Sequence, residues 1–413
     1  MKSKIMTLDN GLRLILTPDK NKNRTTATIT TYAGGLHTHF KYGNKEYKVV
    51  NGIAHFLEHY LLEKSIYGDA MSLFDNDYIE ANGITYRDKT SYYISTVHDF
   101  EDNFIKLINI VNNPLFDEDK IEDVKKPIIS EINRALDNPN RKFGECVNNG
   151  LFKNYPYDPT LGTPKDIKNM TIDDIKIFHE AFYQPSNQAI IISGNFDIKK
   201  IINIINNEYA KLDRKYKKVK AIIEKEPVEV NKKRCKITEN KEGIISVSYK
   251  FDISKYSPIE KNKLDYYLGY ILSNNFSEKS KIFKTILERK ISVYSISYDY
   301  RKIPLQDLAM VVFRLQTNKQ KEAEDIILDR VNNLEYDEES FDTFIKQSLI
   351  NIILDSESAH NTTVNLVGNI EKYEYYKNDD IKFINSLSLK ECKEMIDKLD
   401  FSNMSIAYRI RGE

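Results

Sequence analysis

The chain has 413 residues, of which 41% are hydrophobic and 30% are charged. This length and composition predict a globular protein of roughly two to four domains. Its 61 basic and 61 acidic residues balance, so charge gives no reason to expect nucleic acid or an anionic membrane surface as a partner. We also expect no membrane-spanning segment, because no apolar run is long enough to cross a bilayer.

The first residues and the cysteines both bear on the cellular compartment. Residues 1–9 lack the apolar core of a signal peptide. Cys146, Cys235 and Cys392 are scattered and show no paired spacing of metal ligands. Together these features predict a cytoplasmic protein whose cysteines are reduced thiols.

The first elements along the chain are predicted to be strands. Residues 5–33 contain an alternating apolar stretch from Leu12 to Leu16 and then a β-branched, aromatic run, both typical of strands. His37 and His39 follow two positions apart, where they would share one face of a strand and could bind a metal. No third ligand lies nearby in the sequence, so we interpret them as polar residues near a sheet edge.

Residues 52–62, with the sequence GIAHFLEHYLL, carry the most informative motif. Their apolar residues recur at helical intervals, and residues three and four apart lie on one helical face. His55, Glu58 and His59 would therefore project together, in the H-x-x-E-H pattern of the inverted zinc peptidases. Catalytic zinc takes three protein ligands and a water, whose proton a nearby carboxylate can accept. A chance match on a core helix is the alternative, and only the context decides between them.

Beyond this motif, the pattern predicts a pair of strands followed by two helices. The predicted ranges are 79–85 and 90–97 for the strands, and 100–112 and 121–136 for the helices. Glu131 lies on the last of these helices, between the apolar residues Ile129 and Ile132. A carboxylate among apolar neighbours is unusual unless a cation pairs with it.

The second half of the chain broadly repeats the same order of elements. A segment rich in lysine and glutamate, with Pro227, suits a linker between domains. After it we predict a strand, a helix, two strands, three helices and a last strand, over 244–251, 264–272, 293–300, 306–315, 318–334, 338–354, 388–398 and 402–408. No H-x-x-E-H occurs at the corresponding helix, which contains no histidine. Grouped strands and grouped helices predict α+β domains and not one continuous parallel sheet.

These residues resemble the M16 metallopeptidases, the family of pitrilysin and the mitochondrial processing peptidase, and within it the bacterial peptidases of the YmfH type. The resemblance runs through most of residues 1–200 and continues more faintly to the end. Its motifs follow one another in the family's order, which makes it far more specific than any single match. They include the run from Gly52 to His59, Ala81-Asn82-Gly83 with Thr85, Glu131-Ile132-Asn133, Gly162-Thr163, and the run from Phe182 to Asn187.

The resemblance implies an α+β fold of two homologous domains, each a mostly antiparallel sheet covered by helices. We expect a domain with the zinc site over 1–212, a linker over 213–233, and a non-catalytic domain over 234–413. The resemblance also implies one zinc ion per chain, with His55, His59 and Glu131 as its ligands and Glu58 as general base. An ion pair with a lysine or arginine is the alternative partner for Glu131.

One departure from the family pattern concerns the metal. Seven residues before the distal glutamate the family often keeps a second acidic residue, but this chain has Val124. Glu122 lies two residues away, on the opposite side of a helix, and does not simply replace it. Because outer carboxylates orient metal ligands, this departure bears on zinc affinity more than on ligand identity.

Other departures concern the substrate. In the family the strand that holds Asn82 and Gly83 lies beside the metal and pairs with an extended peptide, and Gly83 replaces the usual alanine. Tyr294 matches the tyrosine of a pair that binds the substrate backbone, but Glu288 stands where its arginine is expected. A strand aromatic packed on the core is the alternative for Tyr294.

Two classes of function follow from this comparison. The first is a zinc endopeptidase that cuts peptides or unfolded segments, in the maturation of a ribosomally made precursor peptide or in general turnover. The second is a non-catalytic M16-like subunit of a heterodimeric peptidase. The intact quartet of His55, Glu58, His59 and Glu131 favours the enzyme. Chains of this length resemble half of the family's four-domain clamshell, so we expect a second M16-like chain, an inactive homologue or a second copy, as partner.

Overall fold

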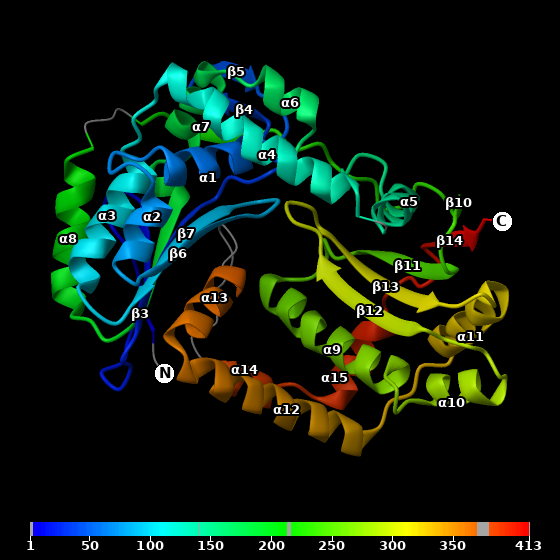
Figure 1. Cartoon of the computed structure of the whole chain (residues 1–413). Helices are drawn as coiled ribbons and strands as arrows, with labels where there is room; N and C mark the ends of the chain where they lie inside the picture. The colour runs from blue at the N-terminus through cyan, green and yellow to red at the C-terminus, as the bar shows by residue number, and fades with distance from the viewer. Residues whose placement is uncertain (1–2, 139, 213–215, 370–379, 413) are drawn as a thin grey trace. The chain divides into compact units, whose positions relative to one another are not determined.

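The computed structural model describes residues 3–138, 140–212, 216–369 and 380–412 (Figure 1). Contacts between residues divide the chain into two compact units, neither of which is contiguous in sequence. The first unit comprises Met1–Leu136, Asp158–Ile223 and Asn351–Asp379, and the second comprises Asp137–Tyr157, Glu224–Ile350 and Asp380–Glu413. These units do not coincide with the expected ranges 1–212 and 234–413, because one segment of each half packs with the other half.

The first unit is built on a six-stranded mixed sheet with the order β1-β2-β8-β3-β7-β6. Its neighbours are antiparallel except for β2 and β8, which run parallel. The strands are β1 (Lys4–Thr7), β2 (Arg13–Pro18), β3 (Thr25–Thr31), β6 (Glu80–Thr85), β7 (Thr90–Thr96) and β8 (Gln188–Gly194). All of the strands predicted in this part of the chain form, and β6 lies at an edge of the sheet.

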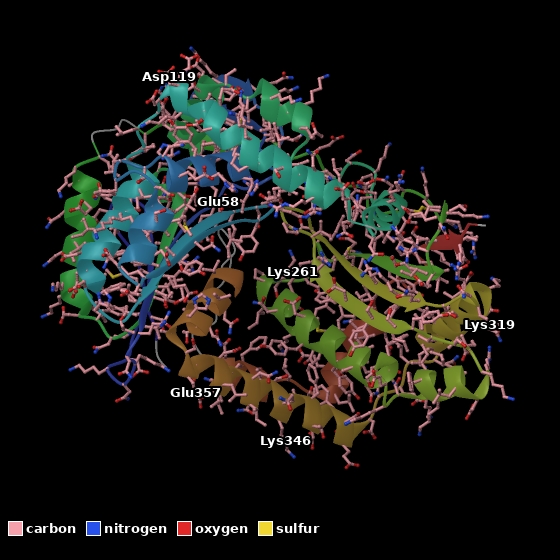
Figure 2. All side chains as sticks on the ribbon, viewed as in Figure 1. Glu58, Asp119, Lys261, Lys319, Lys346 and Glu357 are labelled. Carbon is pink, nitrogen blue, oxygen red and sulfur yellow. A yellow bond between two sulfur atoms is a disulfide. The ribbon has the colours of Figure 1, made fainter. Side chains whose placement is uncertain are left out.

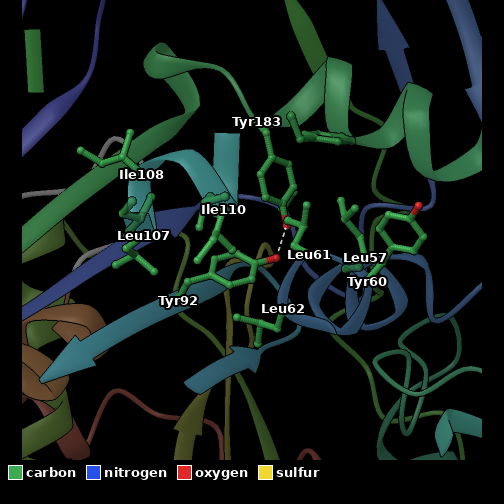
Figure 3. Packing of buried hydrophobic residues seen from close by; sticks show 14 of the residues in the cluster. Leu57, Tyr60, Leu61, Leu62, Tyr92, Leu107, Ile108, Ile110 and Tyr183 are labelled. Atoms are coloured by element: carbon green, nitrogen blue, oxygen red, sulfur yellow. Dashed lines mark hydrogen bonds between the residues drawn. The ribbon is translucent and has the colours of Figure 1, made fainter. Parts of the chain in front are cut away.

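Helices from the first half of the chain cover one face of this sheet. Alternation along the strands sends Leu14, Leu16, Ala27 and Ile29 toward these helices, where all four are fully buried. The helices are α1 (Ile53–Glu63), α2 (Ala70–Asn76), α3 (Phe100–Asn112), α4 (Ile121–Leu136), α6 (Pro164–Asn169), α7 (Ile172–Phe182) and α8 (Ile198–Ala210). The shared core includes the labelled residues of α1 and α3 together with Tyr92, as Figure 3 shows.

The opposite face of the same sheet packs against a helix from the second half of the chain. Ile15 and Ile191 point away from the first core and contact Leu366 and Val367. These two residues belong to α13 (Ala359–Asn369), which lies against β3 and β8. Figure 1 shows α1 and α3 on one side of the sheet and α13 on the other. Both faces of the sheet are therefore partly covered, which explains why β2 and β8 carry apolar residues on both sides.

Part of the predicted linker is also ordered structure in the first unit. Residues 213–215 lie outside the described residues, but β9 (Val219–Ala221) pairs with β4 (His39–Tyr42), which also pairs with β5 (Lys45–Lys48). Residues 219–221 of the predicted linker are thus part of a small three-stranded sheet of the first unit.

The second unit repeats the path of the first. Its five-stranded sheet has the order β10-β14-β11-β13-β12, with β10 and β14 parallel and all other neighbours antiparallel. The same order and directions describe β2-β8-β3-β7-β6 in the first unit. The strands are β10 (Arg234–Glu239), β11 (Ile244–Asp252), β12 (Ser295–Lys302), β13 (Leu308–Gln316) and β14 (Met404–Arg411). The predicted α+β class and the predicted repeat are confirmed.

In this repeat α9 takes the place of α1. Along the chain α9 lies between β11 and β12, just as α1 lies between the matching strands β3 and β6. Helix α9 carries no histidine. The helices of the second half are α9 (Pro258–Phe276), α10 (Lys281–Glu288), α11 (Gln320–Asn332), α12 (Glu338–Glu357), α14 (Asp380–Asn385) and α15 (Leu389–Ile396). Over the described ranges, none of the helices is both long enough and apolar enough to cross a membrane.

The prediction of three reduced cysteines is wrong for two of them. Cys146 lies on α5 (Arg141–Leu151) and forms a disulfide with Cys235 on β10, with their Cα atoms 6.3 Å apart. The two residues are separated by 89 positions in the sequence and meet because α5 packs on β10 and β14. Cys392 is free and buried. The cytoplasmic location, which rested partly on reduced thiols, stays a prediction.

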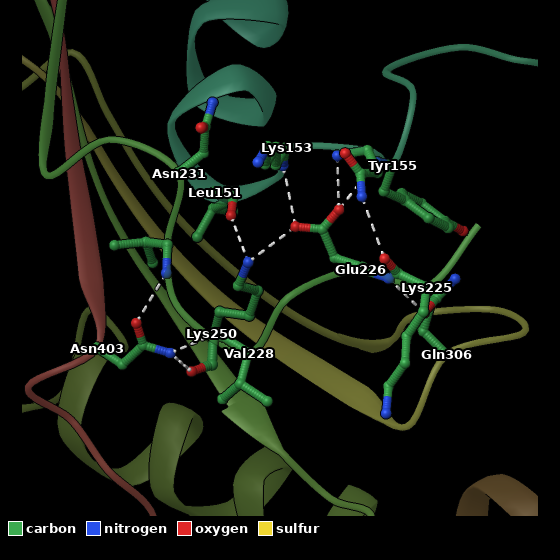
Figure 4. Close-up of polar contacts among 12 residues, drawn as sticks. Leu151, Lys153, Tyr155, Lys225, Glu226, Val228, Asn231, Lys250, Gln306 and Asn403 are labelled. Atoms are coloured by element: carbon green, nitrogen blue, oxygen red, sulfur yellow. Dashed lines mark hydrogen bonds and ion pairs between the residues drawn. The ribbon is translucent and has the colours of Figure 1, made fainter.

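A buried ion pair joins three segments of the second unit (Figure 4). Glu226 and Lys250 have fully buried side chains, and the Lys250 ammonium lies 3.0 Å from Oε1 of Glu226. The ammonium also donates to the carbonyl of Leu151, at 2.6 Å. The Glu226 carboxylate accepts backbone N–H groups from Lys153, Asn154 and Tyr155. Both charges are thus solvated by the protein, which removes most of the cost of burying them.

We predict that Glu226→Gln destabilises the protein by about 3–5 kcal/mol, because it leaves the Lys250 ammonium buried without its counter-charge. Urea unfolding followed by circular dichroism measures the change. Glu224→Gln is the matched control, since Glu224 is exposed and the same substitution there removes no buried pair. Equal midpoints for both variants would contradict the prediction.

Candidate metal centre

Helix α1 presents the H-x-x-E-H residues from a rigid, buried position. It begins after Gly52, whose φ of 83° is the left-handed conformation that favours glycine. A Cβ at this position would lie only 2.6 Å from the carbonyl oxygen of Leu161, so a larger residue would move the start of the helix. Most residues of α1 are buried, which fixes the rotation of the helix about its axis. The predicted helix and the shared face of its polar residues are confirmed.

Glu131 reaches the same place from α4. Its carboxylate Oε2 lies 3.7 Å from Nε2 of His55 and 3.7 Å from Nε2 of His59. One ligand atom from each of the three residues lies within 4.8 Å of the other two, and among the described residues they are the one such group of three or more. Helix α4 is held against α1 through the buried residues Val124 and Ile128 of the common core. This packing, and not the sequence spacing, sets the position of Glu131.

The three residues line an open pocket of about 510 Å³. Its wall is completed by α1, by α2, by the edge strand β6 and by the segment that precedes α6. The remaining lining residues are Glu58, Leu62, Glu63, Met71, Asn82, Gly83, Ile84, Thr85, Thr160 and Leu161. The pocket thus combines several acidic and imidazole groups with one free strand edge.

Glu58 lies between α1 and β6, where only 7% of the residue is exposed (Figure 2). Thr85 donates a hydrogen bond of 2.5 Å to its Oε2. Burial raises the pKa of Glu58, as does the nearby charge of Glu131, while the Thr85 hydrogen bond and the charge of His59 act in the opposite direction. The net result is a carboxylate that accepts a proton more readily than an exposed glutamate does.

The two histidines have different surroundings. Burial, followed by the charge of His59, lowers the pKa of His55 to about 4, so its ring is neutral at pH 7. Burial also lowers the pKa of His59, but a hydrogen bond with Glu63 and the charges of Glu58, Glu63 and Glu131 outweigh it and raise the pKa. A neutral imidazole is the form that binds a metal, so His55 is already in its ligand form.

The donor set fits zinc. Two imidazoles and one carboxylate are a ligand set typical of catalytic zinc, which keeps a fourth position open. Donors about 2.0–2.1 Å from a tetrahedral ion lie roughly 3.3 Å from one another. The observed separations of 3.7 Å from Glu131 to each histidine are close to this value. A further observation is that Nδ1 of His55 is buried without a hydrogen-bond partner among the described residues.

The structure does not bring His37 and His39 into this site. His37 is buried and packs edge-on against Phe182, whereas His39 forms an ion pair with Glu46 at 2.7 Å. Their separate surroundings agree with the interpretation that they are not a metal pair.

The predicted substrate residues lie in two different places. Asn82 and Gly83 are on β6 and line the pocket. A Cβ at Gly83 would come within 2.6 Å of Cγ of Glu58, so the glycine leaves room for that side chain. Tyr294 belongs to the second unit, precedes β12, and is 60% exposed, which rules out the alternative that it is packed in the core. Their roles in binding substrate stay predictions.

Two residues of the site were not singled out by the sequence in their present roles. The sequence shows Thr85 only as part of the Asn82-Gly83 motif, whereas the structure gives it a hydrogen bond to Glu58. Glu63 belongs to no motif of the family, although it stands four residues after His59 on the same helix. That i, i+4 spacing was the available signal, because side chains four apart meet on a helix.

Comparison with known protein families gives two adjoining matches. Residues 43–165 match the model for insulinase, peptidase family M16, and residues 169–348 match the model for the peptidase M16 inactive domain. The first match contains all three candidate ligands and Glu58. The second begins near α7 and ends within α12.

Individual relatives agree with these matches. The chain is 30% identical to the zinc protease YmfH of Bacillus subtilis over 71% of this chain and 69% of that protein. Its fold is similar to that of an M16-like peptidase from Alicyclobacillus acidocaldarius, with a TM-score of 0.86 and 19% identity over 99% of this chain and 98% of the other. It is also similar to the periplasmic protease PqqL of Escherichia coli, with a TM-score of 0.77 and 15% identity. That match covers 100% of this chain but 48% of PqqL.

We predict that Glu131→Gln lowers zinc affinity by more than about 100-fold, since losing a ligand should exceed the ~10–100-fold cost of losing an outer partner. Competition with a chromogenic chelator measures the affinity. Glu122→Gln is the control on the same helix, because its carboxylate pairs with Lys125 outside the pocket. Full zinc affinity in Glu131→Gln would remove Glu131 from the ligand set.

Proposed function

This chain belongs to the M16 insulinase family of peptidases, and we propose that it is a zinc-dependent endopeptidase that cuts peptides or unfolded segments. The observation that carries the proposal is the meeting of His55, His59 and Glu131 beside the buried carboxylate of Glu58 in one open pocket. The alternative is a non-catalytic member of the fold that serves as a binding or assembly subunit. Such a subunit has no physical need of three ligands and a base, so the endopeptidase is favoured.

Glu58 is the residue placed to transfer protons. Zinc, when bound by the three ligands, polarises a peptide carbonyl and lowers the pKa of a water molecule. The hydrogen bond from Thr85 occupies Oε2 of Glu58, which leaves Oε1 to accept the proton of the attacking water. Burial raises the pKa of Glu58, so the carboxyl holds this proton until it passes to the departing amine.

The substrate is proposed to bind as an additional strand on β6. This strand is at the edge of the sheet and, within the described part of the chain, pairs with β7 alone, so its outer backbone groups are available to an extended peptide. Asn82 and Gly83 lie on β6 beside Glu58, which would place the scissile bond next to the base. Main-chain pairing of this kind favours extended or unfolded segments over folded proteins. Tyr294 is proposed as a further backbone contact from the second unit.

A partner chain is the second part of the proposal. Within the described residues, the metal-ligand group occurs in the first unit and has no counterpart in the second. One strand edge beside an open pocket holds a peptide weakly and leaves competing water in place. A second M16-like chain would supply an opposing wall, and we favour an inactive homologue over an identical copy, although closed dimers are the commonest oligomers. Maturation of a ribosomally made precursor peptide and general peptide turnover both suit this arrangement.

We predict that Glu58→Gln keeps zinc and loses hydrolysis, because an amide oxygen does not accept the proton of the water. The loss of a general base costs on the order of 10²–10⁴-fold in rate. Cleavage of an internally quenched peptide measures the rate, and metal analysis of the same sample shows whether zinc is retained. A zinc-loaded variant that cuts at the rate of the unaltered chain would remove Glu58 from the mechanism.

We also predict that the chain by itself has a low specific activity, which stays low at every concentration if the missing partner is an inactive homologue and falls on dilution if the partner is a second copy. The physical reason is that a chain without its partner leaves the pocket open to water. Initial rates over a range of protein concentrations, with sedimentation velocity at the same concentrations, measure both quantities. A monomer that keeps its full specific activity would contradict the assembly proposal while leaving the peptidase proposal intact.

A further inference from the structure

Glu63 lies against the side of His59 that faces away from the candidate ligands. Its Oε1 is 2.9 Å from Nδ1 of His59, while Nε2 of the same ring faces Glu131 at 3.7 Å. The side chain of Glu63 is 30% exposed and lines the pocket. Among the described residues, His59 is the hydrogen-bond and ion-pair partner found for this carboxylate.

This contact fixes which nitrogen of His59 carries the proton. A carboxylate only accepts hydrogen bonds, so Nδ1 must be the donor in the pair. In the neutral ring the lone pair is then on Nε2, the atom that faces Glu131 and His55. The hydrogen bond also prevents rotation of the ring, because a flipped imidazole would lose its acceptor. Carboxylate–histidine contacts of this kind raise the basicity of metal-binding imidazoles.

Among the described residues, no other carboxylate is hydrogen-bonded to Nδ1 of either candidate histidine ligand. At the family's usual position for a second acidic residue the chain has Val124, which is fully buried in the apolar core. The nearby Glu122 is committed to Lys125, at 2.7 Å. His55 has no hydrogen-bond partner at Nδ1 among the described residues. Of the two imidazoles, His59 is therefore the one that a carboxylate holds through Nδ1, and that carboxylate comes from α1 itself.

We propose that Glu63 is a positioning residue for the metal centre, which holds His59 in the tautomer and orientation that bind zinc. The inference rests on the proposed zinc site and adds a residue to it. Glu63 is not itself a ligand, because its Oε1 lies on the Nδ1 side of the ring and it does not belong to the group of candidate ligands. Glu63 on α1 thus takes the role of the carboxylate that the chain lacks at Val124 on α4.

A simpler explanation of the contact is an ordinary ion pair between residues four apart on a helix. Such a pair contributes about 0.2–0.5 kcal/mol to helix stability and has no effect on a metal. The two explanations differ in what they predict for zinc. The ion pair predicts a small change in the melting temperature of the metal-free protein and an unchanged zinc affinity. The positioning role predicts weaker zinc binding and an altered geometry of the bound metal.

The experiment compares the unaltered full-length chain with Glu63→Ala, Glu63→Gln and the control Glu122→Ala. Zinc dissociation constants are measured by chelator competition at pH 7, and visible spectra are recorded after loading with cobalt(II). We expect Glu63→Ala to bind zinc about 10–100-fold more weakly and to change the cobalt(II) bands. Glu63→Gln should lose less, because its amide oxygen accepts the same N–H. Glu122→Ala should match the unaltered chain in both measurements.

Equal zinc affinity and equal cobalt(II) spectra in Glu63→Ala and the unaltered chain would overturn the inference. If Glu131→Gln loses zinc in the same assay, that result leaves the proposed function standing. An unaltered chain that binds no zinc would overturn both. Should Glu63→Ala fail to fold, Glu63→Met takes its place, because its side chain is of similar length but has no carboxylate to accept the N–H of His59. Cobalt(II) bands and zinc affinity equal to those of the unaltered chain in that variant would overturn the inference.

Discussion

The chemistry of this protein depends on the packing of α4 against α1. Helix α1 is buried over most of its surface and α4 buries its apolar face in the same core, so their relative position is set by close-packed side chains. That position brings the carboxylate of Glu131 to 3.7 Å from both imidazoles of α1. A change in this packing would change the distances between these three candidate ligands. Catalytic geometry here is therefore a property of the core.

Each unit contains a buried carboxylate that is surrounded by fixed polar groups. Glu58 has the hydroxyl of Thr85, and Glu226 has three backbone N–H groups and the ammonium of Lys250. The two carboxylates differ in whether both oxygens have hydrogen-bond partners. Glu226 is enclosed on all sides and serves the fold, whereas Glu58 keeps one oxygen directed toward the pocket. Because burial also raises the pKa of Glu58, this free oxygen makes Glu58 suited to accept a proton.

Comparison of the two repeated sheets shows why the candidate metal site is found in the first unit. Both units use the same strand order and directions, so α9 occupies the place of α1. The ligands require two histidines on that helix, and α9 has none. The second unit keeps the scaffold without the metal. Helix α13 comes from the second half of the chain but belongs to the first unit, where its Leu366 and Val367 meet Ile15 and Ile191 on the face of the sheet opposite α1.

The sequence by itself determined the elements with a clear apolar period and proposed the candidate donor set. Periodicity located α1, α3 and α4, and the spacing of His55, Glu58 and His59 placed them on one face, because helical geometry is local. The family resemblance supplied Glu131, 72 positions after His59 (131 − 59). Only the tertiary structure decided which distant residues meet. The Cys146–Cys235 disulfide, the exchange of segments between the two units, and the contacts of Thr85 and Glu63 all depend on side-chain packing and rotamers, which no local pattern encodes.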